Sequence, residues 1–73
     1  MKPTEAMKRA CEIVGSKSAL AKLLSVRAPT ISQWCSGSRP VPPERALQIE
    51  KVCKGCVLRS DLCPDFPWEA AAV

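Results

Sequence analysis

The sequence contains no histidine, and none of its segments approaches the ~20 consecutive apolar residues that a membrane-spanning helix needs. Without histidine the commonest general base is missing, and the chain offers no organised nucleophile, so we expect that it is not an enzyme. With 73 residues there is little room for a deep cleft, and we expect no small-molecule substrate and no cofactor. The first ten residues include Glu5, Lys8 and Arg9 and no apolar run, so we expect no signal peptide. We therefore expect a cytoplasmic protein that does not contact the membrane.

The five cysteines do not form a recognisable site. An odd number of cysteines in a cytoplasmic chain argues against a disulfide framework, so we expect free thiols. Cys53 and Cys56 form a Cys-x-x-Cys pair, and a four-sulfur zinc site can be drawn with Cys63 and either Cys35 or Cys11. Histidine and a second such pair are missing, and Cys11 and Cys53 fall on apolar helix stripes, so we expect no metal. A cysteine-based metal or redox protein is the alternative that metal analysis would reveal.

Positive charge is concentrated in the first half of the chain. Residues 1–39 carry seven cationic and two acidic side chains, a net charge of +5. Residues 40–73 carry four cationic and five acidic side chains, a net charge of −1. This asymmetry suits a protein that meets a polyanion on one side, although charge alone fits a solvated lysine-rich surface equally well.

Apolar spacing predicts an all-α fold of four helices and a short C-terminal turn or fifth helix. The expected caps are Thr4 for the first helix, Ser16 or Ser18 for the second, Ala28 before Pro29 for the third, and Ser60 for a last turn. Gly15 and Gly37 are expected to end the first and third helices, and Pro42 and Pro43 to lead into the fourth. We expect one domain over residues 1–69 and a disordered tail over 70–73. An alternative fold has residues 56–68 as a β-hairpin that pairs between subunits.

The second and third helices, joined at Ser25–Arg27, have the pattern of a helix-turn-helix. Such a pair crosses steeply and needs a small residue at the crossing, which Ala21 supplies. The apolar residues at the spacing that fills the angle between the helices are Leu20, Leu24, Val26, Ile31 and Trp34.

The outer strip of the third helix, at residues 29–36, is made of short or forked hydrogen-bonding side chains. These are the types that read base edges in the major groove, because glutamine pairs with adenine, arginine pairs with guanine, and threonine or alanine methyls meet thymine. The expected base-reading residues are Arg27, Ala28, Pro29, Thr30, Ser32 and Gln33. The expected phosphate contacts, at the margins of the strip, are Lys17, Ser18, Lys22, Ser36, Ser38 and Arg39.

The stretch Ser18–Trp34, followed by Ser36-Gly-Ser-Arg-Pro-Val-Pro, resembles the Cro/CI-type regulators of lambdoid phages. The similarity is greatest to the short prophage branch that includes the YdaS-like proteins, often labelled Cro-like or as antitoxins. The ending Gly55–Asp65 also resembles that branch, so the similarity covers most of residues 10–68. The resemblance implies that Arg27, Ala28, Pro29, Thr30 and Gln33 read bases, and that Lys17, Ser36 and Arg39 contact phosphates.

Three residues depart from the family pattern. Ser25 stands where the turn often has glycine, and Cys35 and Cys63 stand where the branch more often has polar or basic side chains. None of them belongs to the outer strip. The expected function is therefore sequence-specific binding of double-stranded DNA by a transcriptional regulator, a Cro-like repressor associated with the nucleoid of a bacterial cell. Its operator is expected to be a palindrome bound by a homodimer, at least on DNA. The alternative is an antitoxin that sequesters a toxin and regulates its own operon. The sequence leaves open whether Phe66 and Trp68 fold back on the domain or are buried against a second subunit.

Overall fold

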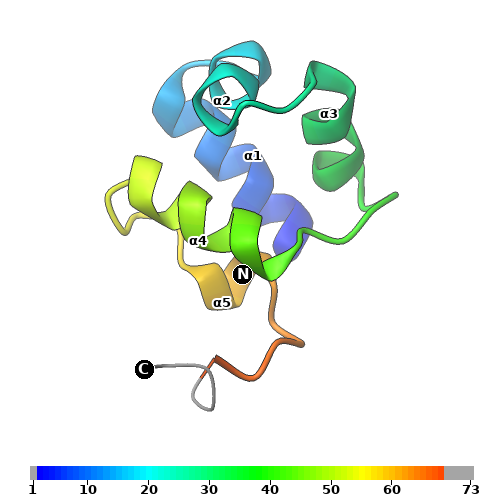
Figure 1. Cartoon of the computed structure of the whole chain (residues 1–73), viewed down its shortest axis with the longest axis vertical. Coiled ribbons are helices and arrows are strands. Elements are labelled where there is room, and N and C mark those ends of the chain that lie inside the picture. Colours follow the sequence, from blue (N-terminus) through cyan, green and yellow to red (C-terminus); the bar gives the residue numbers. More distant parts are fainter. Residues whose placement is uncertain (1, 69–73) are drawn as a thin grey trace.

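The chain folds into five α-helices and, among the residues described, no strand (Figure 1). The structure is a computed structural model in which residues 2–68 are described; the expected tail at 70–73 lies outside them. The helices are α1 (Pro3–Val14), α2 (Lys17–Leu24), α3 (Ala28–Ser36), α4 (Pro43–Val52) and α5 (Arg59–Leu62). The predicted all-α class and the fifth short helix are confirmed. The alternative hairpin is wrong, because α5 occupies residues 59–62 and Val57 is fully buried in the core.

One apolar core joins all five helices. Helix α1 packs against α2, α3 and α5, α2 packs against α3 and α4, and α4 packs against α5. Each helix contributes the residues at its apolar spacing, such as Ala6 and Met7 from α1, Ile49 from α4 and Leu62 from α5, which are almost completely buried. Trp34 is only 4% exposed, which confirms the prediction that it packs in the core. Within residues 2–68, no helix is long and apolar enough to cross a bilayer.

Two predicted helix starts, those of α1 and α3, are wrong by one or two residues. Lys2 rather than Thr4 precedes α1, and Arg27 rather than Ala28 precedes α3, because a proline within the first turn gives up no intrahelical hydrogen bond. At α3 the amide of Thr30 donates to the Arg27 carbonyl oxygen over 3.0 Å, which holds Ala28 in the helix despite the proline after it.

Helix α5 is started by an acidic side chain from α4 and not by Ser60. Leu58 is its N-cap, and the Arg59 amide donates to Glu50 Oε2 over 2.7 Å. The Glu50 carboxylate therefore accepts from one of the first-turn amides that have no partner within the helix. This contact joins α5 to α4.

Candidate nucleic-acid interface

Helices α2 and α3 form a helix-turn-helix around a tight turn. Ser16 caps α2, because its hydroxyl accepts a 3.0 Å hydrogen bond from the Ala19 amide, as one of the two predicted caps. Ser25 ends α2 in the left-handed region, at φ 56° and ψ 41°. The Val26 amide then donates back to the Ala21 carbonyl oxygen over 3.0 Å, which closes the helix as a Schellman motif does. The serine therefore adopts the backbone conformation for which glycine is usually chosen.

The crossing of α2 and α3 is filled as the sequence predicts. Ala21 is only 4% exposed, and Leu20, Leu24 and Ile31 are buried with Trp34, while Val26 is half-buried against the same core. The short Ala21 side chain lets the two helices approach, and the surrounding apolar side chains fix the angle between them. The orientation of α3 is thus set by buried contacts.

The opposite side of α3 carries the predicted base-reading residues. Arg27, Ala28, Pro29 and Ser32 are exposed, and Thr30 and Gln33 are half-buried. The structure therefore brings all six residues together on the first two turns of α3 and the residue before it. None of them is enclosed in the core.

The predicted phosphate-contacting residues surround this strip. Lys17, Ser18 and Lys22 are exposed on α2, and Ser36, Ser38 and Arg39 are exposed at the end of α3 and just beyond it. The Ser36 and Ser38 hydroxyls lie 3.0 Å apart, and the Arg39 amide donates to the Gln33 carbonyl oxygen over 3.3 Å, so this segment folds back on α3. No residue between Glu12 and Glu44 is acidic. The helix-turn-helix therefore presents only positive formal charge.

Sequence reasoning missed one residue that supports this interface. Arg45 Nη1 donates to the Leu24 carbonyl oxygen over 2.9 Å and to Gln48 Oε1 over 2.8 Å. It thereby anchors α4 to the end of α2, directly before the turn. The only signal in the sequence is a cation at the edge of the apolar stripe of α4, and its partner lies 21 residues earlier.

The cysteines are packed as small apolar residues, and two of them meet. Cys11 Sγ and Cys35 Sγ lie 3.9 Å apart, and both side chains are buried, as is Cys53. Burial, followed by the nearby Cys35 thiol, raises the pKa of the Cys11 thiol to about 12, and burial also raises the pKa of Cys53. Among residues 2–68, no three cysteine or acidic side chains are grouped so that they could hold a metal ion.

The aromatic residues near the C-terminus fold back on the domain. Trp68 Nε1 donates to the Cys63 carbonyl oxygen over 2.8 Å, and the Trp68 ring packs against the core. The Phe66 ring lies 4.5 Å from it between centroids, and the Arg59 guanidinium lies 5.6 Å from the Trp68 ring centroid. Of the two possibilities left open by the sequence, the structure shows the fold-back.

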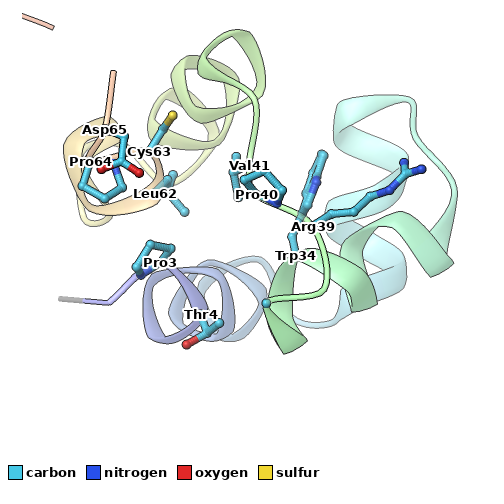
Figure 2. Close-up of a pocket in the computed structure, with 11 residues that line it drawn as sticks. Pro3, Thr4, Trp34, Arg39, Pro40, Val41, Leu62, Cys63, Pro64 and Asp65 are labelled. Carbon is cyan, nitrogen blue, oxygen red and sulfur yellow. The ribbon is translucent and has the colours of Figure 1, made fainter. Parts of the chain in front are cut away.

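A pocket of about 290 Å³ lies away from the outer strip of α3. Figure 2 shows it between the start of α1, the segment from Trp34 to Val41 and the end of α5, with the Arg39 side chain extending away from its other lining residues. Its walls are mostly apolar, with Leu62 and Pro64 on one side and Pro3 on another. This position separates the pocket from the predicted base-reading residues.

The fold and the arrangement of α2 and α3 define a small all-α helix-turn-helix protein. The family described as "Bacterial toxin YdaS" matches residues 7–71, and the chain belongs to this family. This confirms the resemblance to the YdaS-like branch.

Two relatives fit the same picture. The chain is 43% identical over 67 residues to the "Putative transcriptional regulator YdaS" of Escherichia coli (strain K12), which covers 92% of this chain and 68% of that protein. It is 34% identical over 55 residues to the "Regulatory protein cro" of Pseudomonas phage D3, which covers 75% of each. Among solved structures, none matches the chain.

Proposed function

We propose that this chain is a transcriptional regulator that binds a specific double-stranded DNA site with α3 in the major groove. The observation that carries this function is the two-sided character of α3. Its inner side is buried through Ile31 and Trp34, and its outer side presents exposed hydrogen-bonding residues such as Arg27 and Ser32, with Gln33 half-buried beside them. The names of both relatives, a transcriptional regulator and a Cro protein, support it.

The charges around α3 suit a phosphate backbone. Lys17 and Lys22 on α2 and Arg39 after α3 flank the outer strip, and the segment between Glu12 and Glu44 has no acidic side chain to repel DNA. In this function Lys17, Ser18, Lys22, Ser36, Ser38 and Arg39 contact phosphates and fix the position of α3. Arg27, Ala28, Pro29, Thr30, Ser32 and Gln33 read the bases.

One such module contacts few base pairs, so two copies are proposed to bind a palindromic operator with half-sites ~34 Å apart. We propose that the chain acts as a single DNA-binding domain in the bacterial cytoplasm and that it catalyses no reaction. By occupying a promoter it represses transcription from that promoter. The family description speaks of a toxin. We propose that such toxicity comes from occupying promoters that the cell needs. The antitoxin alternative stays a prediction, tested by co-purification with the product of a neighbouring gene.

Selection from a random duplex pool tests this function. The full chain, in reductant, is expected to enrich a palindromic sequence whose two halves are one helical turn apart. Affinity for the enriched duplex is then measured against a scrambled duplex over a series of salt concentrations. Lys17→Ala is expected to weaken both duplexes equally and to reduce the salt slope by about 1, whereas the control Lys8→Ala, an exposed lysine on α1, leaves both unchanged. Enrichment of no sequence over the starting pool would contradict sequence-specific binding.

A further inference from the structure

Helix α4 has an outward face that no other part of the described chain covers. Glu44, Leu47, Gln48 and Lys51 follow the i, i+3, i+4, i+7 spacing that puts them on one side of a helix, and all four are exposed. Ala46 and Ile49 on the other side are completely buried. Leu47 is 39% exposed at the centre of the outward face, and is therefore an apolar side chain surrounded by polar ones.

A second exposed leucine stands close to this face. Leu58, which is 49% exposed, directly precedes Arg59. Arg59 is tied to α4 twice, because its amide donates to Glu50 Oε2 over 2.7 Å and its Nε lies 3.5 Å from Glu50 Oε1. A shallow groove of about 410 Å³ runs along the helix and is lined by Leu47, Lys51 and Arg59 among others. We call Glu44, Leu47, Gln48 and Lys51 the α4 surface.

The charged residues of the α4 surface are placed so that they can pair with the oppositely charged residues of the same surface on a second copy of the chain. Glu44 lies at the start of the helix and Lys51 at its end, with Leu47 and Gln48 midway between them. When two such helices pack antiparallel about a two-fold axis, Glu44 of each copy faces Lys51 of the other and the two Leu47 side chains meet at the centre. Parallel packing would instead bring like charges together. Within the described residues neither Glu44 nor Lys51 has an ion-pair partner in its own chain.

We propose that the α4 surface is the contact between two copies of this chain, packed antiparallel across a two-fold axis. This deepens the proposed function by naming the partner that a palindromic site requires. In Figure 1 α4 lies below α2 and to the left of α3, and none of the residues of the α4 surface belongs to the base-reading strip, so the contact uses no base-reading residue. A face built on one 10-residue helix buries less than the ~1,200 Å² of a standard interface, so the free protein associates weakly and a DNA site holds both copies together.

The test is sedimentation of the full chain in reductant and without DNA, from about 10 µM to about 1 mM. The wild type is expected to show a reversible monomer–dimer equilibrium in this range. Leu47→Glu is expected to raise the dissociation constant by about tenfold or more, because it places two carboxylates at the centre of the contact. The matched control is Ile13→Glu on α1, where the wild-type side chain is equally exposed at 39%, and it is expected to leave the dissociation constant unchanged.

Charge reversal provides the second part of the test. Glu44→Lys and Lys51→Glu, each alone, are expected to raise the dissociation constant about fivefold, because two symmetric pairs become repulsive. The double variant Glu44→Lys/Lys51→Glu is expected to return to within about twofold of the wild type, because the opposite charges face each other again. The helix dipole cannot produce this recovery, since the double variant places both charges at the wrong end of α4. Circular dichroism confirms that each variant is folded.

Three results would overturn the α4 contact: a wild type that stays monomeric over the whole range, a dimer that tolerates Leu47→Glu, or a double variant no tighter than its parents. Failure of the proposed function is separable from these, because no DNA is present in the measurement. We expect the monomeric Leu47→Glu variant to bind a single half-site as the wild type does, but to bind the palindrome without cooperativity. Such a result would show that the base-reading strip is intact and that only the contact between copies is lost.

Discussion

The Arg45 guanidinium donates a 2.9 Å hydrogen bond to the main-chain carbonyl of Leu24, the last residue of α2. The last carbonyl groups of a helix have no partner within the helix and carry its partial negative charge, so a buried or half-buried cation stabilises them. Through this bond α4 holds the end of α2 at the point where the chain turns into α3. Arg45 is therefore a positioning residue for the helix-turn-helix, although it lies outside it in the sequence.

Replacing Arg45 should destabilise the whole domain. Arg45→Met keeps most of the apolar stem and removes the donor, and we expect the free energy of unfolding to fall by about 1–2 kcal/mol. Arg9→Met, at an exposed arginine of α1, is the control and should change it by less than about 0.5 kcal/mol. Urea unfolding followed by circular dichroism measures both. Equal effects of the two substitutions would show that the Leu24 contact adds nothing to stability.

Ser25 adopts a left-handed conformation that is costly for any residue with a Cβ atom. Because its φ is 56°, Ser25→Gly should raise the free energy of unfolding by about 0.5–1 kcal/mol. The same change at Ser60, inside α5, should lower the free energy of unfolding by a similar amount. Glycine relieves no strain at a helical position, and it makes the unfolded chain more flexible. Thermal unfolding of the two variants compares them directly. A loss of stability in Ser25→Gly would mean that the serine side chain contributes more than the strain costs.

Gly37 is required both by its backbone angle and by its neighbour. Its φ is 84°, and a Cβ atom built on it would lie 3.2 Å from Thr4 Cγ2. Gly37→Ala should therefore lower the free energy of unfolding by about 1–3 kcal/mol. Gly55→Ala is a matched control for backbone strain alone, since its φ is 80° and no atom lies within 4 Å of the added Cβ.

The difference between the two glycine variants isolates the contact with α1. Gly37→Ala should cost more than Gly55→Ala, and adding Thr4→Ser, which removes the crowded methyl group, should recover part of that difference. Equal losses in the two glycine variants, with no recovery from Thr4→Ser, would show that α1 does not approach the end of α3 as closely as described.

The buried thiols predict a loss of stability in alkaline solution. Burial, with Cys35 nearby, raises the pKa of Cys11 to about 12 in the folded protein, above its ordinary value of 9.0. The folded state thus holds the thiol proton more tightly than the unfolded state. The resulting stability is present in full below pH 9.0 and is lost as pH rises from there towards 12. Cys53, whose pKa burial also raises, adds a change of the same sign.

Unfolding by urea in reductant, at pH 7 and at pH 10, measures this loss. Cys11→Ala should show a smaller fall between the two pH values than the wild type, whereas Cys63→Ala, at a cysteine that contributes to neither raised pKa, should show the same fall as the wild type. The comparison within each variant removes the constant cost of the cavity left by the Cys11 substitution. If the free energy of unfolding of Cys11→Ala fell as much between pH 7 and pH 10 as that of the wild type, groups other than Cys11 would be responsible for the loss of stability in alkaline solution.

The helix-turn-helix was predictable from the sequence because its determinants are local. Ala21, Ile31 and Trp34 show their inward positions through helical spacing, and Ser16 marks a helix start by its own hydrogen-bonding capacity. The starts at Lys2 and Arg27 were missed because proline fits more than one place in a first turn. The all-α class followed from the same periodicity.

Contacts between distant residues could not be predicted in this way. Nothing in the spacing of Cys11 and Cys35 shows that their sulfur atoms lie 3.9 Å apart, since that depends on how α1 crosses α3. The same holds for Arg45 and Leu24, and for the Glu50 carboxylate that serves the start of α5 in place of Ser60. These contacts arise only once the core has brought the helices together.

The central claim is that the outer strip of α3 reads base pairs, and Gln33 tests it most directly. We expect Gln33→Ala to lower affinity for the selected operator by about 1–3 kcal/mol and to relax the preference at one base pair in each half-site. Non-specific binding should stay the same, and Lys8→Ala, at an exposed lysine of α1, should leave operator affinity unchanged. Fluorescence anisotropy with every single-base operator variant measures this pattern. A Gln33→Ala protein with wild-type affinity and an unchanged preference at every position would contradict the assignment of α3 as the reading helix.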